Sequence, residues 1–188
     1  ENKSNSTFLG YWKLGISVAA AIALLLYLFN ENSNSAKAST IKSLLGSVKI
    51  IQQNGNELMN PEVGTSISIG STIETVSMGS FVELEFHDQS IVTLSDLSQC
   101  VILRYDSNYR ELRLLKGKFT SDIKTKTNKT PLKVYTPSFS LNVIEAKFDI
   151  VTMEEFSHFR AEKGKVQLTR LSDSQSKEVS KNQEIFFS

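Results

Sequence analysis

The side chains most often used in catalysis and metal binding are sparse and scattered in this 188-residue chain. The two histidines are His87, in a predicted turn beside Asp88, and His158, within an apolar segment. Neither has a nearby cysteine or a helix-spaced second histidine, which a zinc site would need. We therefore expect a solvated His87–Asp88 pair, a strand position for His158, and no metal site.

The remaining reactive groups give no catalytic pattern either. Cys100 is the single cysteine, so an internal disulfide is excluded, and a buried structural thiol is expected. Glu83 and Glu85 alternate with apolar residues, which predicts a solvated strand face rather than an acid–base pair. No glycine-rich phosphate loop precedes a helix. The sequence therefore predicts no enzyme, no cofactor and no small-molecule substrate.

One candidate contact surface comes from the charge pattern around residues 125–130. Its six lysines are Lys116, Lys118, Lys124, Lys126, Lys129 and Lys133. A basic loop of this kind could bind anionic lipid headgroups or an acidic partner. The alternative, which we favour, is a charged edge that keeps strands from aggregating. The net charge of the whole chain is +1, so no bulk field attracts nucleic acid.

An apolar stretch near the N-terminus predicts a transmembrane helix over residues 11–29. Residues 14–29 carry no charge, and aromatic residues stand at both boundaries. The spanning residues are Tyr11, Trp12, Leu14, Ile16, Val18, Ile22, Leu24, Leu25, Leu26, Tyr27, Leu28 and Phe29. The alternatives are a buried soluble helix and a signal peptide cleaved near Ala36-Lys37-Ala38. The apolar run is longer than a signal-peptide core, so we expect a single-pass anchor.

The charges around this span predict its orientation. Lys3 and Lys13 precede it and Glu31 follows it, which favours a cytoplasmic N-terminus, although Lys37 and Lys42 weaken the bias. Residues 1–10 would then be a short cytoplasmic tail. Residues 30–44, rich in Asn, Ser and Ala, are predicted to be a flexible linker, and residues 45–188 a separate domain.

From residue 45 onward the hydrophobic pattern has the period of two that is typical of β-strands. Val82, Leu84 and Phe86, for example, alternate with the two glutamates. Asn54-Gly55-Asn56 predicts a tight hairpin, and residues 87–90 and 106–108 predict further turns. No segment after Thr40 keeps a helical period for three turns. We predict an all-β fold, an antiparallel β-sandwich or barrel-like domain of many short strands.

The order of motifs in this domain resembles the FecR-type periplasmic domain of bacteria. The matching segments are residues 46–48, Gly64, residues 69–75, Ser80, the strand at 81–86, the turn at 88–90, and residues 114–119, 134–137, 145–150 and 164–166. Gln89 stands where the family has a turn glycine, and Glu145-Ala146 stands where it has Gly-Thr. Both departures affect backbone geometry, so we expect a divergent member.

The resemblance implies a single-pass regulator of the bacterial inner membrane. In such proteins a cytoplasmic N-terminal region binds a sigma factor, and a periplasmic part senses an outer-membrane receptor. The same domain also occurs in proteins that have no sigma-factor role. We therefore expect the N-terminus in the cytoplasm and the C-terminal domain in the periplasm.

Two functions fit these expectations. The first is a non-catalytic interaction module, a subunit or scaffold of a cell-envelope complex, and we prefer it because residues 1–10 show no sigma-binding helical region. The second is a transmembrane signalling regulator of the anti-sigma type. In both, the expected partners are membrane or periplasmic proteins and the lipid bilayer, but not nucleic acid. A homo-oligomer is compatible with both.

Overall fold

The structure is a computed structural model that describes residues 36–124, 130–154 and 156–187. The predicted tail at 1–10 and the predicted transmembrane helix at 11–29 lie outside these ranges, as do Lys126 and Lys129. Within the described ranges, no helix is long and apolar enough to cross a membrane.

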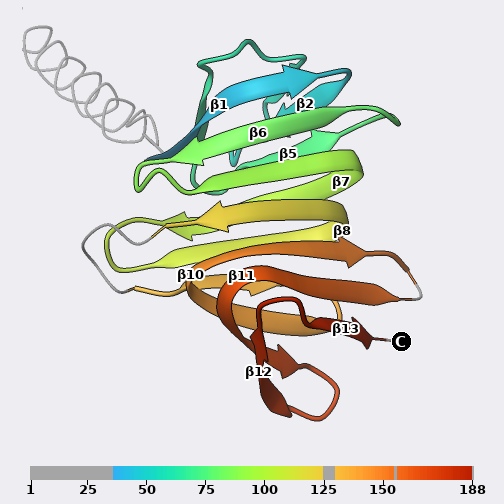
Figure 1. The fold of residues 1–188 in the computed structure, drawn as a ribbon. Helices are drawn as coiled ribbons and strands as arrows, with labels where there is room; N and C mark the ends of the chain where they lie inside the picture. The colour runs from blue at the N-terminus through green and yellow to red at the C-terminus, as the bar shows by residue number, and fades with distance from the viewer. Residues whose placement is uncertain (1–35, 125–129, 155, 188) are drawn as a thin grey trace, which may run out of the picture. The chain divides into compact units, whose positions relative to one another are not determined.

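The described part of the chain is all-β, as the alternating pattern predicts, and its 13 strands belong to one hydrogen-bonded sheet (Figure 1). The strands are β1 (Lys37–Leu45), β2 (Val48–Ile51), β3 (Glu57–Met59), β4 (Ser66–Ser68), β5 (Thr72–Thr75), β6 (Phe81–Phe86), β7 (Ile91–Tyr105), β8 (Arg110–Ile123), β9 (Leu132–Tyr135), β10 (Phe139–Thr152), β11 (Ser157–Arg170), β12 (Ser176–Ser180) and β13 (Glu184–Phe187). The expected antiparallel pairing dominates, and among the described pairs β8–β9 is the parallel one.

The sheet is open, which corrects the prediction of a barrel-like domain of many short strands. Its order runs from β12 through β11, β10, β9, β8, β7, β5 and β2 to β3, and its two ends are not bonded to each other. Strands β7, β8, β10 and β11 are 14 or 15 residues long. Gly117 lies inside β8 at a φ of 92°. A glycine tolerates this positive φ, so the strand bends there instead of ending.

Each long strand bends once and contributes to two parts of the sheet. In β7, Val92 and Leu94 are buried before the bend, Asp96 and Leu97 are exposed, and burial resumes at Ser98. Residues before the bend pair with β6, and residues after it pair with β5. The buried side chains of both halves belong to one hydrophobic core, so the sheet folds over on itself around that core.

The domain begins earlier than predicted, because part of the predicted flexible linker at 30–44 is strand β1. Ala38 and Ile41 are fully buried, and β1 pairs with both β6 and β4. The sequence Ala-Ser-Thr in this strand lacks the large apolar residues that make alternation visible. Small side chains can nevertheless pack against a core where the neighbouring strand is close.

Large aromatic side chains fill the lower part of the core, near the end of the chain. Phe139 stacks on Phe187 with ring centroids 4.6 Å apart, and Phe159 packs edge-on against Phe139. Phe148 lies between Phe119 and Phe159. Aromatic pairs of this kind add about 0.5–1.5 kcal/mol beyond the area they bury. The Phe139–Phe187 stack attaches the last strand, β13, to β10, and backbone pairing attaches it to β11.

Candidate functional site

The structure gives each of the sequence-predicted reactive residues a structural role. Cys100 is buried in β7, and burial raises the pKa of its thiol to about 12. His158 lies on β11, as predicted, 3.3 Å from the Glu184 carboxylate. His87 is exposed, as predicted, but it does not pair with Asp88: its Nε2–H donates to the carbonyl oxygen of Lys37 over 2.7 Å. Among the described residues, no group of three or more His, Cys, Asp or Glu side chains could hold a metal.

The described members of the predicted basic surface do not gather in one place. Lys116 and Lys118 flank the bend of β8, Lys124 follows the end of that strand, and Lys133 lies on β9. Lys118 and Lys124 are six positions apart, which corresponds to about 20 Å of extended chain. Both β8 and β9 are paired on both sides, so these lysines do not lie on open edge strands.

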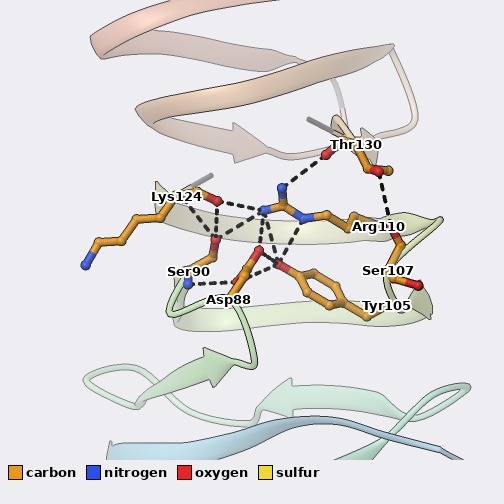
Figure 2. A network of polar contacts seen from close by, with 7 residues as sticks. All are labelled: Asp88, Ser90, Tyr105, Ser107, Arg110, Lys124 and Thr130. Carbon is orange, nitrogen blue, oxygen red and sulfur yellow. Dashed lines mark hydrogen bonds and ion pairs between the residues drawn. The ribbon is translucent and has the colours of Figure 1, made fainter. Parts of the chain in front are cut away.

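Asp88 pairs not with His87 but with Arg110, a buried arginine that the sequence pattern did not indicate (Figure 2). Arg110 begins β8, its side chain is 6% exposed, and its Nη2 lies 2.7 Å from the Asp88 carboxylate. Tyr105 donates its hydroxyl hydrogen to Asp88 over 3.1 Å and lies beneath the guanidinium. Burial raises the pKa of Tyr105, and the neighbouring Arg110 opposes this shift. The phenol therefore stays protonated and remains a donor to the carboxylate.

The same network ties together three connections between strands. Arg110 donates to the carbonyl oxygens of Thr130 and Lys124 and to the Ser90 hydroxyl. Figure 2 shows Ser90, Lys124 and Thr130 around the guanidinium, and the Thr130 hydroxyl donates in turn to the carbonyl oxygen of Ser107. The β6–β7 turn, the β7–β8 hairpin and both ends of the β8–β9 connection are thereby fixed. We call this side of the sheet the pinned edge.

The first strand of the domain also starts at the pinned edge. The His87 bond to Lys37 attaches the beginning of β1 to the same turn that carries Asp88. Strand β7 leaves this edge at Ile91, bends at Asp96 and Leu97, and returns to it at Tyr105. The bend of β7 therefore lies on the opposite side of the sheet.

That opposite side carries most of the exposed large hydrophobic residues of the described chain, nine of 14. They are Leu45, Val76, Met78, Leu97, Leu115, Met153, Phe156, Leu171 and Phe186. We call this set the apolar edge. Met78 is 74% exposed and Leu97 is 47% exposed, whereas the comparable residues near the pinned edge are Tyr109 and Ile144.

Hydrogen bonds link neighbouring segments along the apolar edge. The Val76 amide donates to the Ser47 carbonyl, and the Gly79 amide donates to the Asp96 carboxylate over 2.6 Å. The Lys118 amide donates to the Ser98 hydroxyl over 2.7 Å. Farther along, Gly117 pairs with Thr152, and the Ser138 and Ser157 hydroxyls lie 3.0 Å apart. The lower end of the edge thus reaches β13, on the side where Figure 1 marks the C-terminus.

The bend at the centre of the apolar edge has a backbone that L-residues rarely adopt. Asp96 and Leu97 have φ values of 36° and 53°. A leucine in this region is strained, and its side chain is nonetheless exposed rather than packed. Ser98 fills the space beside Gly117, so any side chain at position 117 would collide with it. The bend therefore holds Leu97 outward.

Comparison with known proteins identifies the family and the fold. The FecR protein family matches residues 71–167, more than half of the chain and most of the sheet. Two crystal structures of a candidate anti-sigma factor from Parabacteroides distasonis have a similar fold, each with a TM-score of 0.54. Their sequences are 16% and 18% identical to this one, over 61% of this chain and 53% of theirs. The chain thus spans about half the length of those structures.

No curated protein sequence matches the chain. The family match covers the bends of β7 and β8 and the Arg110 network, and it includes both departures noted in the sequence. Gln89 adopts a φ of 65°, the conformation for which the family uses glycine. With the motif order, the matched residues and the fold in agreement, this chain belongs to the FecR protein family.

Proposed function

We propose that this FecR domain is the non-catalytic binding module of a bacterial transmembrane signalling regulator. Residues 11–29 would anchor it in the inner membrane, with the N-terminus in the cytoplasm and the β domain in the periplasm. Family membership supports the regulatory role, and the likeness to structures assigned as a candidate anti-sigma factor agrees with it. This choice reverses our preference from the sequence, which placed the envelope scaffold first.

The observation that carries the proposal is the one-sided distribution of exposed hydrophobic residues. Contiguous exposed apolar surface is a mark of protein–protein interaction sites. Here the exposed apolar residues line the side of the sheet away from the start of β1. The pinned edge has the opposite character, because its contacts centre on the buried Arg110 guanidinium, which pairs with Asp88. We therefore assign the apolar edge as the docking surface for another membrane or periplasmic protein.

A transcript measurement in the native organism tests this role. A strain that lacks the gene is complemented with the wild type, with Met78→Asp/Leu97→Asp, or with Tyr109→Asp/Ile144→Asp. The first pair charges the apolar edge, and aspartate tolerates the backbone at position 97. The second pair is a control at two residues that are each 50% exposed.

The proposal predicts that loss of the gene changes the transcripts of one alternative sigma factor's genes. The charged apolar edge should reproduce that change, and the control pair should behave as the wild type. Unchanged transcripts in the deletion strain would contradict the regulatory role and favour the scaffold hypothesis. Identical effects of both variant pairs would contradict the assignment of the docking surface.

A further inference from the structure

Strand β13 leaves one side of the sheet open. It pairs with β11 on one side, and within the described residues no strand pairs with its other side. An edge strand presents alternate backbone N–H and C=O groups that can bond to another chain. A strand added to β13 would therefore depend on the backbone groups that point outward and on the side chains beside them.

The register of the pair identifies the outward groups. The Ala161 amide donates to the Gln183 carbonyl, so the 161–183 pair is a hydrogen-bonded one. The aligned pairs that follow are 160–184, 159–185, 158–186 and 157–187. Because hydrogen-bonded and non-bonded pairs alternate, the 158–186 pair is a non-bonded one. The N–H and C=O of Phe186 therefore point away from β11, toward the open side.

The side chains around Phe186 offer an apolar setting for an added strand. The Phe186 side chain is 70% exposed and stacks on His158 with ring centroids 4.4 Å apart. One groove beside it is lined by Pro137, Leu171 and Phe187. A second groove, between β12 and β13, has Leu168 and Ile185 along its floor. Grooves beside an open strand receive alternate side chains when a peptide adds to a sheet.

The other outer strands, β12, β3 and β4, are less suited than β13 to pairing with an added strand. Strand β12 carries Lys177 and Glu178, both exposed, and charged residues protect an edge from pairing. Strands β3 and β4 have three residues each, which leaves little backbone to pair. Strand β13 is thus the described edge with an exposed aromatic residue at its centre.

The charged residues on the rims of the two grooves indicate which charge the side chains of an added strand would have. Arg170 lies on both grooves and Lys177 on the second, while the carboxylate of Glu184 is engaged by His158. Arg170 itself lies 3.2 Å from Asp173, at an exposed position where a stronger acidic partner can compete. The rim is therefore complementary to acidic side chains.

We propose that β13 binds an extended segment of the partner protein by strand addition, and that this segment alternates apolar and acidic residues. The proposal rests on the proposed function, since it names the chemistry of the partner that docks on the apolar edge. The partner strand would bond to the N–H and C=O of Phe186. Its apolar side chains would enter the two grooves, and its acidic side chains would face Arg170 and Lys177.

A displayed library of random nonapeptides, selected on the purified full chain, tests this proposal without knowledge of the partner. The affinity of the most enriched peptide is then measured for four variants. Phe186→Ala and Phe186→Pro both lack the ring, but only the proline also lacks the outward N–H. Glu178→Ala and Glu178→Pro are the matched pair on β12, where the Arg170–Gln175 hydrogen bond places the Glu178 amide outward by the same alternation.

We expect the enriched peptides to alternate apolar and acidic residues. The Phe186→Pro variant should bind the most enriched peptide about fivefold more weakly than Phe186→Ala, because it lacks one hydrogen bond. The two variants at 178 should bind equally. No enrichment, equal binding by the two variants at 186, or self-association of the chain through β13 would overturn strand addition by a partner. Wild-type transcripts in the Phe186→Pro strain, with changed transcripts in the deletion strain, would leave the proposed function standing while this inference fails.

Discussion

Asp88 and Arg110 form an ion pair of 2.7 Å in which the arginine is buried and the aspartate half-buried. Asp88 comes from the β6–β7 turn and Arg110 from the start of β8, and each also bonds to the Tyr105 hydroxyl. A buried ion pair adds little net stability, but removing one partner leaves an unpaired buried charge. The pair therefore fixes the arrangement of the turns at the pinned edge more than it raises the stability of the whole sheet.

Removal of the carboxylate should destabilise the domain more than removal of both charges. Asp88→Ala leaves the Arg110 guanidinium buried without its counter-ion, at an expected cost of about 3 kcal/mol in the free energy of unfolding. Asp88→Ala/Arg110→Met should regain part of that loss, because an apolar side chain then fills the site. Urea denaturation followed by circular dichroism measures both. A double variant less stable than Asp88→Ala would show that Arg110 has other essential contacts.

Gly117→Ala should prevent the normal bend of β8. The substituted residue would keep a positive φ, and its Cβ would collide with Ser98. Gly79→Ala is the matched control, because Gly79 has a φ of 74° but no neighbour within 4 Å of the added Cβ. We expect a loss of about 1 kcal/mol for Gly79→Ala and about 2 kcal/mol more for Gly117→Ala. Equal losses in thermal unfolding would contradict the packing argument.

Gln89→Gly should stabilise the domain, although it shortens a side chain. Gln89 holds a φ of 65° in the β6–β7 turn, a conformation that costs an L-residue about 1 kcal/mol and glycine almost nothing. The gain is reduced by the greater freedom of glycine in the unfolded chain. A higher urea midpoint for Gln89→Gly, with Gln89→Ala no higher than the wild type, would confirm this. A lower midpoint for the glycine variant would show that the Gln89 side chain is needed.

Cys100 should not react with thiol reagents in the folded domain. Its pKa of about 12, raised from 9.0 by burial, lowers the thiolate fraction at neutral pH about a thousandfold. The unfolded chain loses this proton near pH 9 and the folded chain only near pH 12, so the free energy of unfolding falls as the pH rises through that window. Below pH 9 the contribution is fully present. In urea titrations, the free energy of unfolding should therefore fall less between pH 8 and pH 10 for Cys100→Val than for the wild type.

The sequence could predict the strands whose faces differ strongly in polarity. Phe81–Phe86 alternates cleanly, and the predicted Asn54-Gly55-Asn56 hairpin joins β2 to β3. Strand β1 was assigned to a linker because its buried residues include alanine and serine, which carry little hydrophobic signal. The long strands were predicted as short ones, since a glycine at a bend, such as Gly117, and a glycine at a turn look alike along the chain.

The candidate site was harder to predict, because its residues meet only in the folded sheet. Arg110 lies in a segment that reads as polar, and nothing along the chain marks it as the buried partner of Asp88, 22 positions away. The residues of the apolar edge are spread from Leu45 to Phe186, and each alone is an ordinary surface hydrophobic. The FecR match spans the bends of β7 and β8, but only the pairing of these strands in the folded sheet brings the two bends side by side.

Photo-crosslinking from two positions in native membranes tests the central claim most directly. A photoreactive amino acid replaces Met78 on the apolar edge or Tyr109 near the pinned edge, and crosslinked proteins are identified by mass spectrometry. We predict that position 78 crosslinks to one membrane or periplasmic protein and that position 109 does not. The absence of a crosslink from position 78, or the same partner at equal yield from both positions, would contradict the claim that the apolar edge is the docking surface.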